Sequence, residues 1–136
     1  MDPLTFDHVR QSYGRCIAQL GFFDRFYELF LASSDRIPEM FKNTDFVKQK
    51  DLLKEGIALV VMFAKNETSP LVKGKLQHIG TRHSRGDLNI TEDMYPLWIE
   101  SLIHTIREYD GKFTPQLEEE WRQVMVPAIE YLKALH

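Results

Sequence analysis

Apolar residues recur every three or four positions through almost the whole chain, and this period limits the fold more than any other feature. The first stripe is Phe6, Val9, Tyr13, Cys16 and Leu20. An α-helix turns once every 3.6 residues, so such steps place side chains on one face. No segment shows the strict alternation that is typical of a half-buried strand. The sequence therefore predicts an all-α protein.

Proline, glycine and capping residues divide this pattern into about six or seven helices, some of them longer than about 15 residues. Gly21 is placed to end the first helix or to mark a sharp change of direction, and a long helix is expected from about Asp45 to Lys65. Thr91 is the expected N-cap of a later helix, and Thr114-Pro115 is the expected start of the last one. Unequal helices and one tight corner favour steep crossings around a buried pocket over an up-down bundle.

The composition is that of a single ordinary globular domain spanning residues 1–136. The chain has 136 residues, 43% of them hydrophobic, with 17 basic and 20 acidic groups and a net charge of −3. This slightly acidic balance provides no basic field, so neither nucleic acid nor a membrane surface is an expected partner.

The cysteine count and the distribution of apolar residues favour a cytoplasmic protein. Cys16 is the one cysteine, so it cannot form an internal disulfide. The longest apolar run, residues 57–64, is far shorter than the ~20 residues of a membrane-spanning helix. The charged start MDPLTFDHVR does not resemble a signal peptide.

His83 is the best candidate for a metal ligand, because it ends an apolar stripe formed by Val72, Leu76 and Ile79. The alternative is a core histidine that is hydrogen-bonded to a backbone carbonyl. His78 cannot share a metal with His83, since five helical residues leave their side chains about 140° apart. The sequence also lacks phosphate-binding glycine motifs, HExxH and CxxC, so any activity is expected to come from a bound group.

Two more polar residues occupy apolar stripes on other helices. Tyr27 lies among phenylalanines, and Gln49 heads a stripe that continues through Leu53 and Ile57. Tyr27 could equally be a core tyrosine bonded to a carbonyl, and Gln49 a solvated residue in a first turn. Together with His83, they would frame a slot for a flat apolar cofactor with an axial ligand.

The sequence resembles the globins over nearly its full length, and most of all the single-domain bacterial and flavohaemoglobin-type globins. FFDRFYELF is similar to the second-helix motif whose tyrosine lies on the ligand side of haem. IPEMF resembles the corner whose phenylalanine packs on haem, here Phe41, fourteen positions after Tyr27. The stretch from IGTRH to DGKFT resembles the proximal segment, with His83 forty-two positions after Phe41.

The resemblance implies a globin fold in which the family's helix D is absent or minimal, and a bound haem b (iron protoporphyrin IX). It also implies that His83 is the metal ligand, Tyr27 and Gln49 are distal polar residues, and Tyr95 buttresses the histidine. The full expected cofactor-binding set is Tyr27, Phe41, Gln49, Leu53, Ile57, Ile79, Arg82, His83, Tyr95 and Trp98.

The sequence departs from the family pattern at three points. Asp35 replaces the usual proline before the corner phenylalanine. The interval from the corner to Gln49 is shorter than in the flavohaemoglobins, and a shift of one or two positions would bring Lys48 or Asp51 to the ligand instead. Glu130 is a loose match for the glutamate that completes the proximal network of flavohaemoglobins.

The resemblance implies a haem protein that reversibly binds a diatomic gas, with oxygen the first candidate and nitric oxide the second. One alternative is an enzyme, either a nitric oxide dioxygenase or a peroxidase-like protein. The chain has no room for a flavin domain, so such an enzyme would need a separate reductase. Another alternative is a sensor module, with or without haem.

Overall fold

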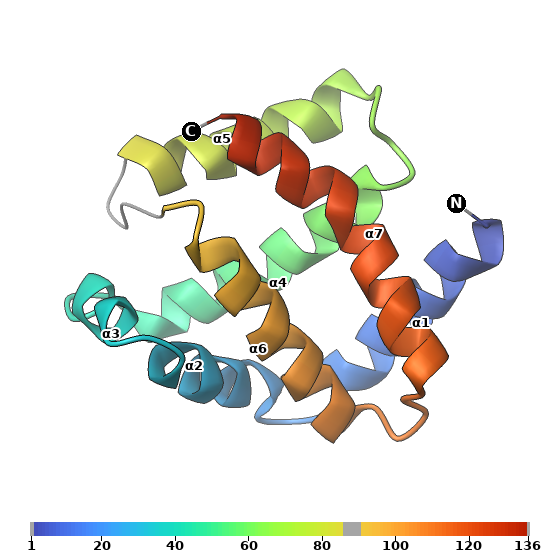
Figure 1. Cartoon of the computed structure of the whole chain (residues 1–136), viewed down its shortest axis with the longest axis horizontal. Coiled ribbons are helices and arrows are strands. Elements are labelled where there is room, and N and C mark those ends of the chain that lie inside the picture. The colour runs from blue at the N-terminus through green and yellow to red at the C-terminus, as the bar shows by residue number, and fades with distance from the viewer. Residues whose placement is uncertain (1, 86–90, 136) are drawn as a thin grey trace.

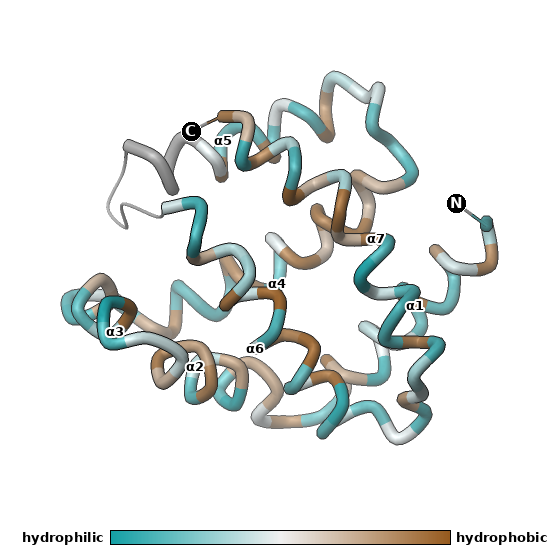
Figure 2. Tube along the Cα trace, viewed as in Figure 1, coloured by the Kyte–Doolittle hydropathy of each residue, from teal (hydrophilic) through white to brown (hydrophobic). Residues whose placement is uncertain are grey.

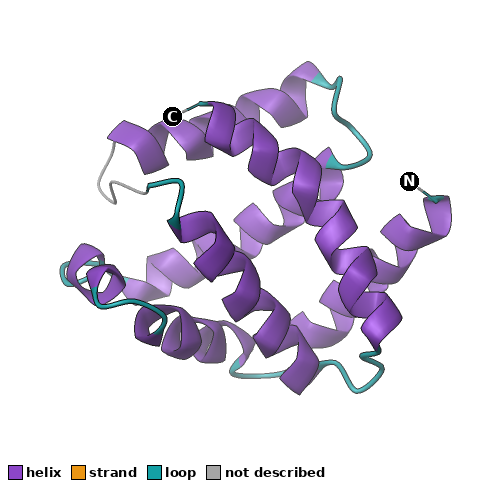
Figure 3. Ribbon diagram, viewed as in Figure 1, coloured by secondary structure: helices purple, strands orange, loops and turns teal. Residues whose placement is uncertain are grey.

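Seven α-helices make up the part of the chain that the computed structural model describes: the backbone of residues 2–85 and 91–135, and the side chains of residues 2–80 and 91–135. The helices are α1 (Pro3–Ile17), α2 (Phe22–Ala32), α3 (Arg36–Met40), α4 (Phe46–Phe63), α5 (Pro70–Arg85), α6 (Met94–Tyr109) and α7 (Pro115–Ala134). These residues contain no strand (Figure 3). The all-α prediction is confirmed, and residues 41–45 join α3 to α4 without a further helix.

Side-chain caps start three of the helices. The carboxylate of Asp2 accepts a hydrogen bond from the backbone N–H of Leu4 at 2.9 Å, and that of Asp45 accepts from Val47 at 3.0 Å. The Thr114 hydroxyl accepts from Leu117 at 3.0 Å. Each cap satisfies a backbone donor that has no partner within its helix. The predicted starts of α4 and α7 are therefore confirmed.

Two other helix ends differ from the sequence prediction. Helix α1 ends at Ile17 rather than at Gly21, which leaves Leu20 100% exposed on the turn instead of on the apolar stripe. Gly21 has a φ of 90°, so the chain reverses at the residue type that adopts this conformation most easily. Helix α6 begins at Met94 rather than after Thr91, because the Thr91 hydroxyl bonds the Asp93 carboxylate instead of capping the helix.

The helices cross one another steeply in two layers (Figure 1). Helix α7 packs against α1 and α4, α6 packs against α2, and α5 packs against α4. Polar and apolar positions alternate along each helix, as Figure 2 shows, so each helix has one side for the core and one for water. None of the described helices is long and apolar enough to span a bilayer.

A buried polar cluster joins α1 to α7 and to the end of α6. The Asp110 side chain is fully buried, and its carboxylate accepts hydrogen bonds from Arg15 at 2.7 and 2.9 Å and from the Ser12 hydroxyl at 2.6 Å. Trp121 donates its indole N–H to Ser12 at 2.9 Å. A buried carboxylate needs such partners, so this cluster fixes how the three helices meet.

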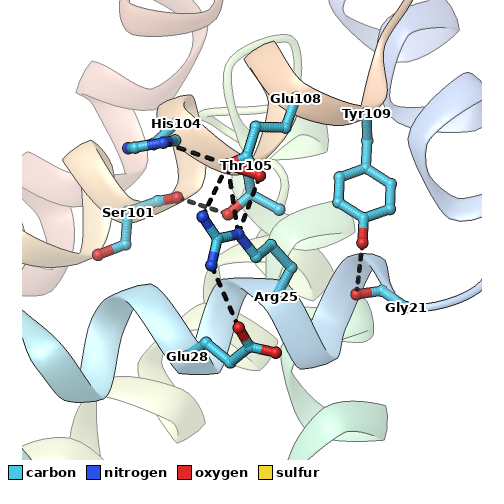
Figure 4. A network of polar contacts seen from close by, with 8 residues as sticks. All are labelled: Gly21, Arg25, Glu28, Ser101, His104, Thr105, Glu108 and Tyr109. Atoms are coloured by element: carbon cyan, nitrogen blue, oxygen red, sulfur yellow. Dashed lines mark hydrogen bonds and ion pairs between the residues drawn. The ribbon is translucent and has the colours of Figure 1, made fainter.

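A second, exposed cluster joins α2 to α6 (Figure 4). Arg25 donates to both carboxylate oxygens of Glu108 at 2.9 Å, and it also pairs with Glu28 at 3.1 Å. Tyr109 donates its hydroxyl to the carbonyl of Gly21 at 3.2 Å. These contacts hold α2 and α6 side by side, and both helices contribute to the pocket described next.

Candidate functional site

A cavity of about 890 Å³ lies between the helices and is lined mostly by apolar side chains. Helices α2, α4, α5, α6 and α7 and the corner after α3 all contribute to its lining. The residues are Tyr27, Phe30, Phe41, Gln49, Leu52, Leu53, Glu55, Gly56, Ala58, Leu59, Val60, Met62, Pro70, Leu71, Gly74, Lys75, His78, Ile79, Met94, Tyr95, Trp98, Ile129 and Leu132. Its size falls in the ~300–1,000 Å³ range of ligand and cofactor pockets.

Aromatic rings build the wall of this cavity near the α3 corner. Phe41 is 5% exposed, and its ring lies edge-on to Tyr27 at 6.0 Å and to Phe30 at 6.1 Å, measured between ring centroids. Phe46 stacks on Phe41 at 6.1 Å from the first turn of α4. Rigid rings in these arrangements hold the corner against α2 and α4.

Tyr27 brings a buried hydroxyl to this wall. Its side chain is 6% exposed, and its hydroxyl donates to the backbone carbonyl of Gln49 at 3.5 Å. Tyr27 therefore bonds a backbone carbonyl, as expected for a core tyrosine. A hydrogen bond of this length is at the weak limit of hydrogen bonding. Burial raises the pKa of Tyr27 to about 12, so the hydroxyl keeps its proton at neutral pH and remains a donor.

Gln49 lines the cavity from the first turn of α4 and is half-buried. Lys48 and Asp51 are exposed and do not line it. Of the three residues that the sequence left open for this position, Gln49 is therefore the one that lines the cavity.

Helix α6 closes the cavity with Tyr95 and Trp98, while Ile79 contributes from α5 and Leu53 from α4. Burial raises the pKa of Tyr95 to about 12, with the charge of Glu92 adding to the effect. Seven of the ten cofactor-binding candidates from the sequence thus line one cavity.

Ile57 is different: it is fully buried in the core and does not line the cavity. The apolar stripe of α4 is wide enough that its far edge packs against neighbouring helices instead. Glu130 does not line the cavity either. Its carboxylate is largely exposed and lies 3.8 Å from the amine of Lys133.

The predicted metal ligand His83 and its neighbour Arg82 belong to the last turns of α5, but their side chains lie outside the described residues. The role of Tyr95 in supporting His83, which the resemblance implies, therefore remains a prediction. The beginning of the same stripe behaves as expected, since Val72 and Leu76 are buried and Ile79 lines the cavity.

The sequence interpretation missed the outer part of the cavity, where α4 faces α5. Leu52, Gly56 and Leu59 follow helical steps of four and three on α4, and Leu71 and His78 lie two turns apart on α5. The available signal was a second apolar stripe on α4, next to the one that contains Leu53.

A crystal structure of a protein from Pseudomonas aeruginosa PAO1, described as structurally highly homologous to a human haemoglobin, superimposes on this fold with a TM-score of 0.88. The two sequences are 40% identical, and the match covers 96% of this chain and 97% of the other. The chain belongs to the globin family. No family model and no curated protein matches the sequence of this globin.

The globin fold implies a haem cofactor, and the residues of the cavity fit one. The cavity is large, it is walled by aromatic and aliphatic side chains, and it has few polar groups. The weakly bonded hydroxyl of Tyr27 is one of those groups. A flat apolar macrocycle requires this combination of surfaces.

Proposed function

We propose that this globin holds haem b in the cavity, with His83 as the protein ligand of the iron, and reversibly binds a diatomic gas. Oxygen is the first candidate and nitric oxide the second. The observation that carries the proposal is the Tyr27 hydroxyl, which is buried in an apolar wall and held by a hydrogen bond of 3.5 Å.

Haem iron that is ligated by one imidazole supplies an open coordination position for a small ligand. The protein contributes the surroundings of that position. Phe41, Leu53 and Trp98 present apolar surface to the cavity. A hydrogen bond made beside such apolar surface is stronger than one made in water, because the local dielectric constant is lower.

Tyr27 and Gln49 are the expected donors to a ligand that carries partial negative charge. The hydrogen bond of the Tyr27 hydroxyl to the Gln49 carbonyl is weak at 3.5 Å, so little free energy is lost when a bond to the ligand replaces it. The side-chain amide of Gln49 offers a second N–H from the same wall. Two neutral hydrogen bonds of about 1 kcal/mol each lower the dissociation constant by roughly 30-fold.

The haem ring itself would be held by the apolar wall and by α5. Ile79 lines the cavity one turn before His83, and Tyr95 faces it from α6. In this proposal Arg82 supplies a positive charge to the acidic edge of the ring, and Tyr95 supports the histidine.

Replacement of the proposed ligand tests this function directly. The His83→Ala variant, expressed with ample haem, is expected to lose most of its Soret absorption, because no other group in the proposal ligates the iron. Added imidazole should restore a five- or six-coordinate spectrum by entering the vacated position.

The matched control is His104→Ala, since His104 lies on α6 and pairs with Glu108 at 3.2 Å on the surface. This control should keep its haem and its spectrum. If His83→Ala retained haem with an unchanged spectrum, the ligand assignment would be wrong.

A further inference from the structure

Asp93 occupies the N-cap position of α6 but does not cap the helix. Aspartate is one of the residue types that cap helices best, and the carboxylates of Asp2 and Asp45 do cap α1 and α4. The Asp93 carboxylate instead accepts hydrogen bonds from the Arg36 guanidinium at 3.0 Å and from the Thr91 hydroxyl. A local rule that a chain breaks at one position often marks a functional constraint there.

Arg36 reaches this site from α3, 57 positions earlier in the chain. One end of its guanidinium fork donates to Asp93, and the other donates to the Thr91 hydroxyl at 3.4 Å. The Thr91 hydroxyl and the charge of Arg36 lower the pKa of Asp93, so its carboxylate is ionised at neutral pH. An arginine suits such a two-pronged contact, because its planar group presents several N–H donors at fixed angles.

This contact extends the seam between α2 and α6. Arg25 pairs with Glu108, and Phe26 packs edge-on against Trp98 at 5.9 Å between ring centroids, so these two contacts hold the later turns of α6. Helix α3 follows α2 and packs mainly against it. Arg36 therefore fastens the first turn of α6 to the same side of the molecule.

The two segments that this contact joins both lead directly into the wall of the cavity. Asp93 is followed by Met94 and Tyr95, which are each 4% exposed and line the cavity. Phe41, which directly follows α3, lines it as well. Arg36 and Asp93 themselves do not line the cavity, so any effect on its contents acts through these neighbours.

We propose that Arg36 and Asp93 are positioning residues. Their contact holds the first turn of α6 beside the α3 corner, and the position of this turn slows the loss of haem from the cavity. The first part stands on the contacts alone, whereas the second rests on the proposed function. Both side chains are more than half exposed, so salt should screen their attraction.

Amide hydrogen exchange of the full chain tests the first part. The amide groups of Met94 and Tyr95 donate to the backbone carbonyls of Thr91 and Glu92, so they report on the first turn. In Arg36→Gln they should exchange about two- to fivefold faster than in the wild type, as expected for loss of an exposed ion pair. Amides in the middle of α7 should keep their rates, because the change is local.

Asp93→Asn separates this contact from ordinary helix capping. Asparagine is as good an N-cap as aspartate but has no charge, so a role as a helix start alone predicts wild-type exchange. The proposal predicts the same acceleration as in Arg36→Gln. The double variant should be no faster than either single variant, since both changes remove one contact.

Transfer of haem to an excess of apomyoglobin tests the second part. At low salt, the loss of haem followed by Soret absorption should be about two- to fivefold faster in Arg36→Gln and in Asp93→Asn than in the wild type. The difference should disappear in about 1 M NaCl, where the Debye length is about 3 Å. Arg36→Lys, which keeps the positive charge, should lie closer to the wild type than Arg36→Gln.

Lys42→Gln is the matched control. Lys42 belongs to the same corner, and it pairs with Glu39 at 2.5 Å rather than with α6. This variant removes an exposed ion pair of the same kind, so it should leave both amide exchange at the start of α6 and haem loss unchanged.

Three results would each overturn the proposal. The first is wild-type exchange at Met94 and Tyr95 in Arg36→Gln or in Asp93→Asn. The second is a rate of haem loss that does not change in these variants, or that Lys42→Gln raises equally. The third is additive acceleration in the double variant, which would mean that the two residues act separately.

Failure of the proposed function would give a different result. A chain that retained no haem would refute gas binding and the effect on haem loss. Amide exchange in that haem-free chain would still decide whether Arg36 and Asp93 hold the start of α6.

Discussion

At the scale of the residue, the position of the Tyr27 hydroxyl is the detail on which gas affinity is expected to depend. Tyr27→Phe removes this donor while keeping the ring that packs against Phe41 and Phe46. We expect oxygen to dissociate roughly fivefold faster, which corresponds to about 1 kcal/mol. Stopped-flow or flash-photolysis kinetics measure this rate.

Tyr13→Phe is the control for this prediction, since the Tyr13 hydroxyl donates to the carbonyl of Lys54 at 2.9 Å, away from the cavity. It should leave the oxygen dissociation rate unchanged. An unaltered rate in Tyr27→Phe would remove this residue from the proposed distal pair.

At the scale of the element, the placement of α5 depends on a close approach to α7 at Gly80. A Cβ added to Gly80 would lie 2.5 Å from Leu135 Cδ1 and 3.3 Å from Leu132 Cδ2, whereas one added to Gly74 meets open space. We expect Gly74→Ala to raise the free energy of unfolding by about 0.5–1 kcal/mol through helix propensity. Gly80→Ala should be less stable than Gly74→Ala by up to about 1 kcal/mol, because the end of the Leu135 side chain must shift to make room.

Chemical denaturation of the two glycine variants measures this difference. The double variant Gly80→Ala with Leu135→Ala should recover part of it, because the crowded methyl group is then gone. Equal stabilities of Gly74→Ala and Gly80→Ala would show that α5 is not held by this contact.

At the scale of the whole molecule, the Asp110 cluster couples three helices and makes stability depend on pH. Burial would raise the pKa of Asp110, but hydrogen bonds from Arg15, Ser12 and the Lys112 backbone outweigh it, so the pKa is lowered. The stabilisation is therefore present above the unfolded-state pKa of about 3.9 and is lost as the pH falls through the lower folded-state value.

Asp110→Asn should lower the free energy of unfolding at pH 7 by about 2–4 kcal/mol, because it leaves Arg15 without its partner. It should also reduce the loss of stability between neutral and acidic pH. Denaturation curves at several pH values test both effects. Asp7→Asn is the control, since Asp7 lies 3.8 Å from Arg10 on the surface and should contribute little. A wild-type pH profile in Asp110→Asn would contradict the assignment.

The sequence by itself determined the helical class, most helix starts and the order of the candidate site residues. These features depend on local properties, namely the 3.6-residue period and the caps at Asp45 and Thr114. The predicted helix ends were wrong by three residues at Leu20 and by two at Thr91, where the local signal allowed two solutions.

Only the tertiary structure decided which side chains share the cavity. It showed that Gln49 rather than Lys48 lines the wall, that Ile57 packs in the core, and that Lys75 and His78 line the cavity from α5. The helical period gives the direction in which a side chain points around the helix axis. What that side chain meets depends on how neighbouring helices cross it, and contacts between residues far apart in the sequence set those crossings.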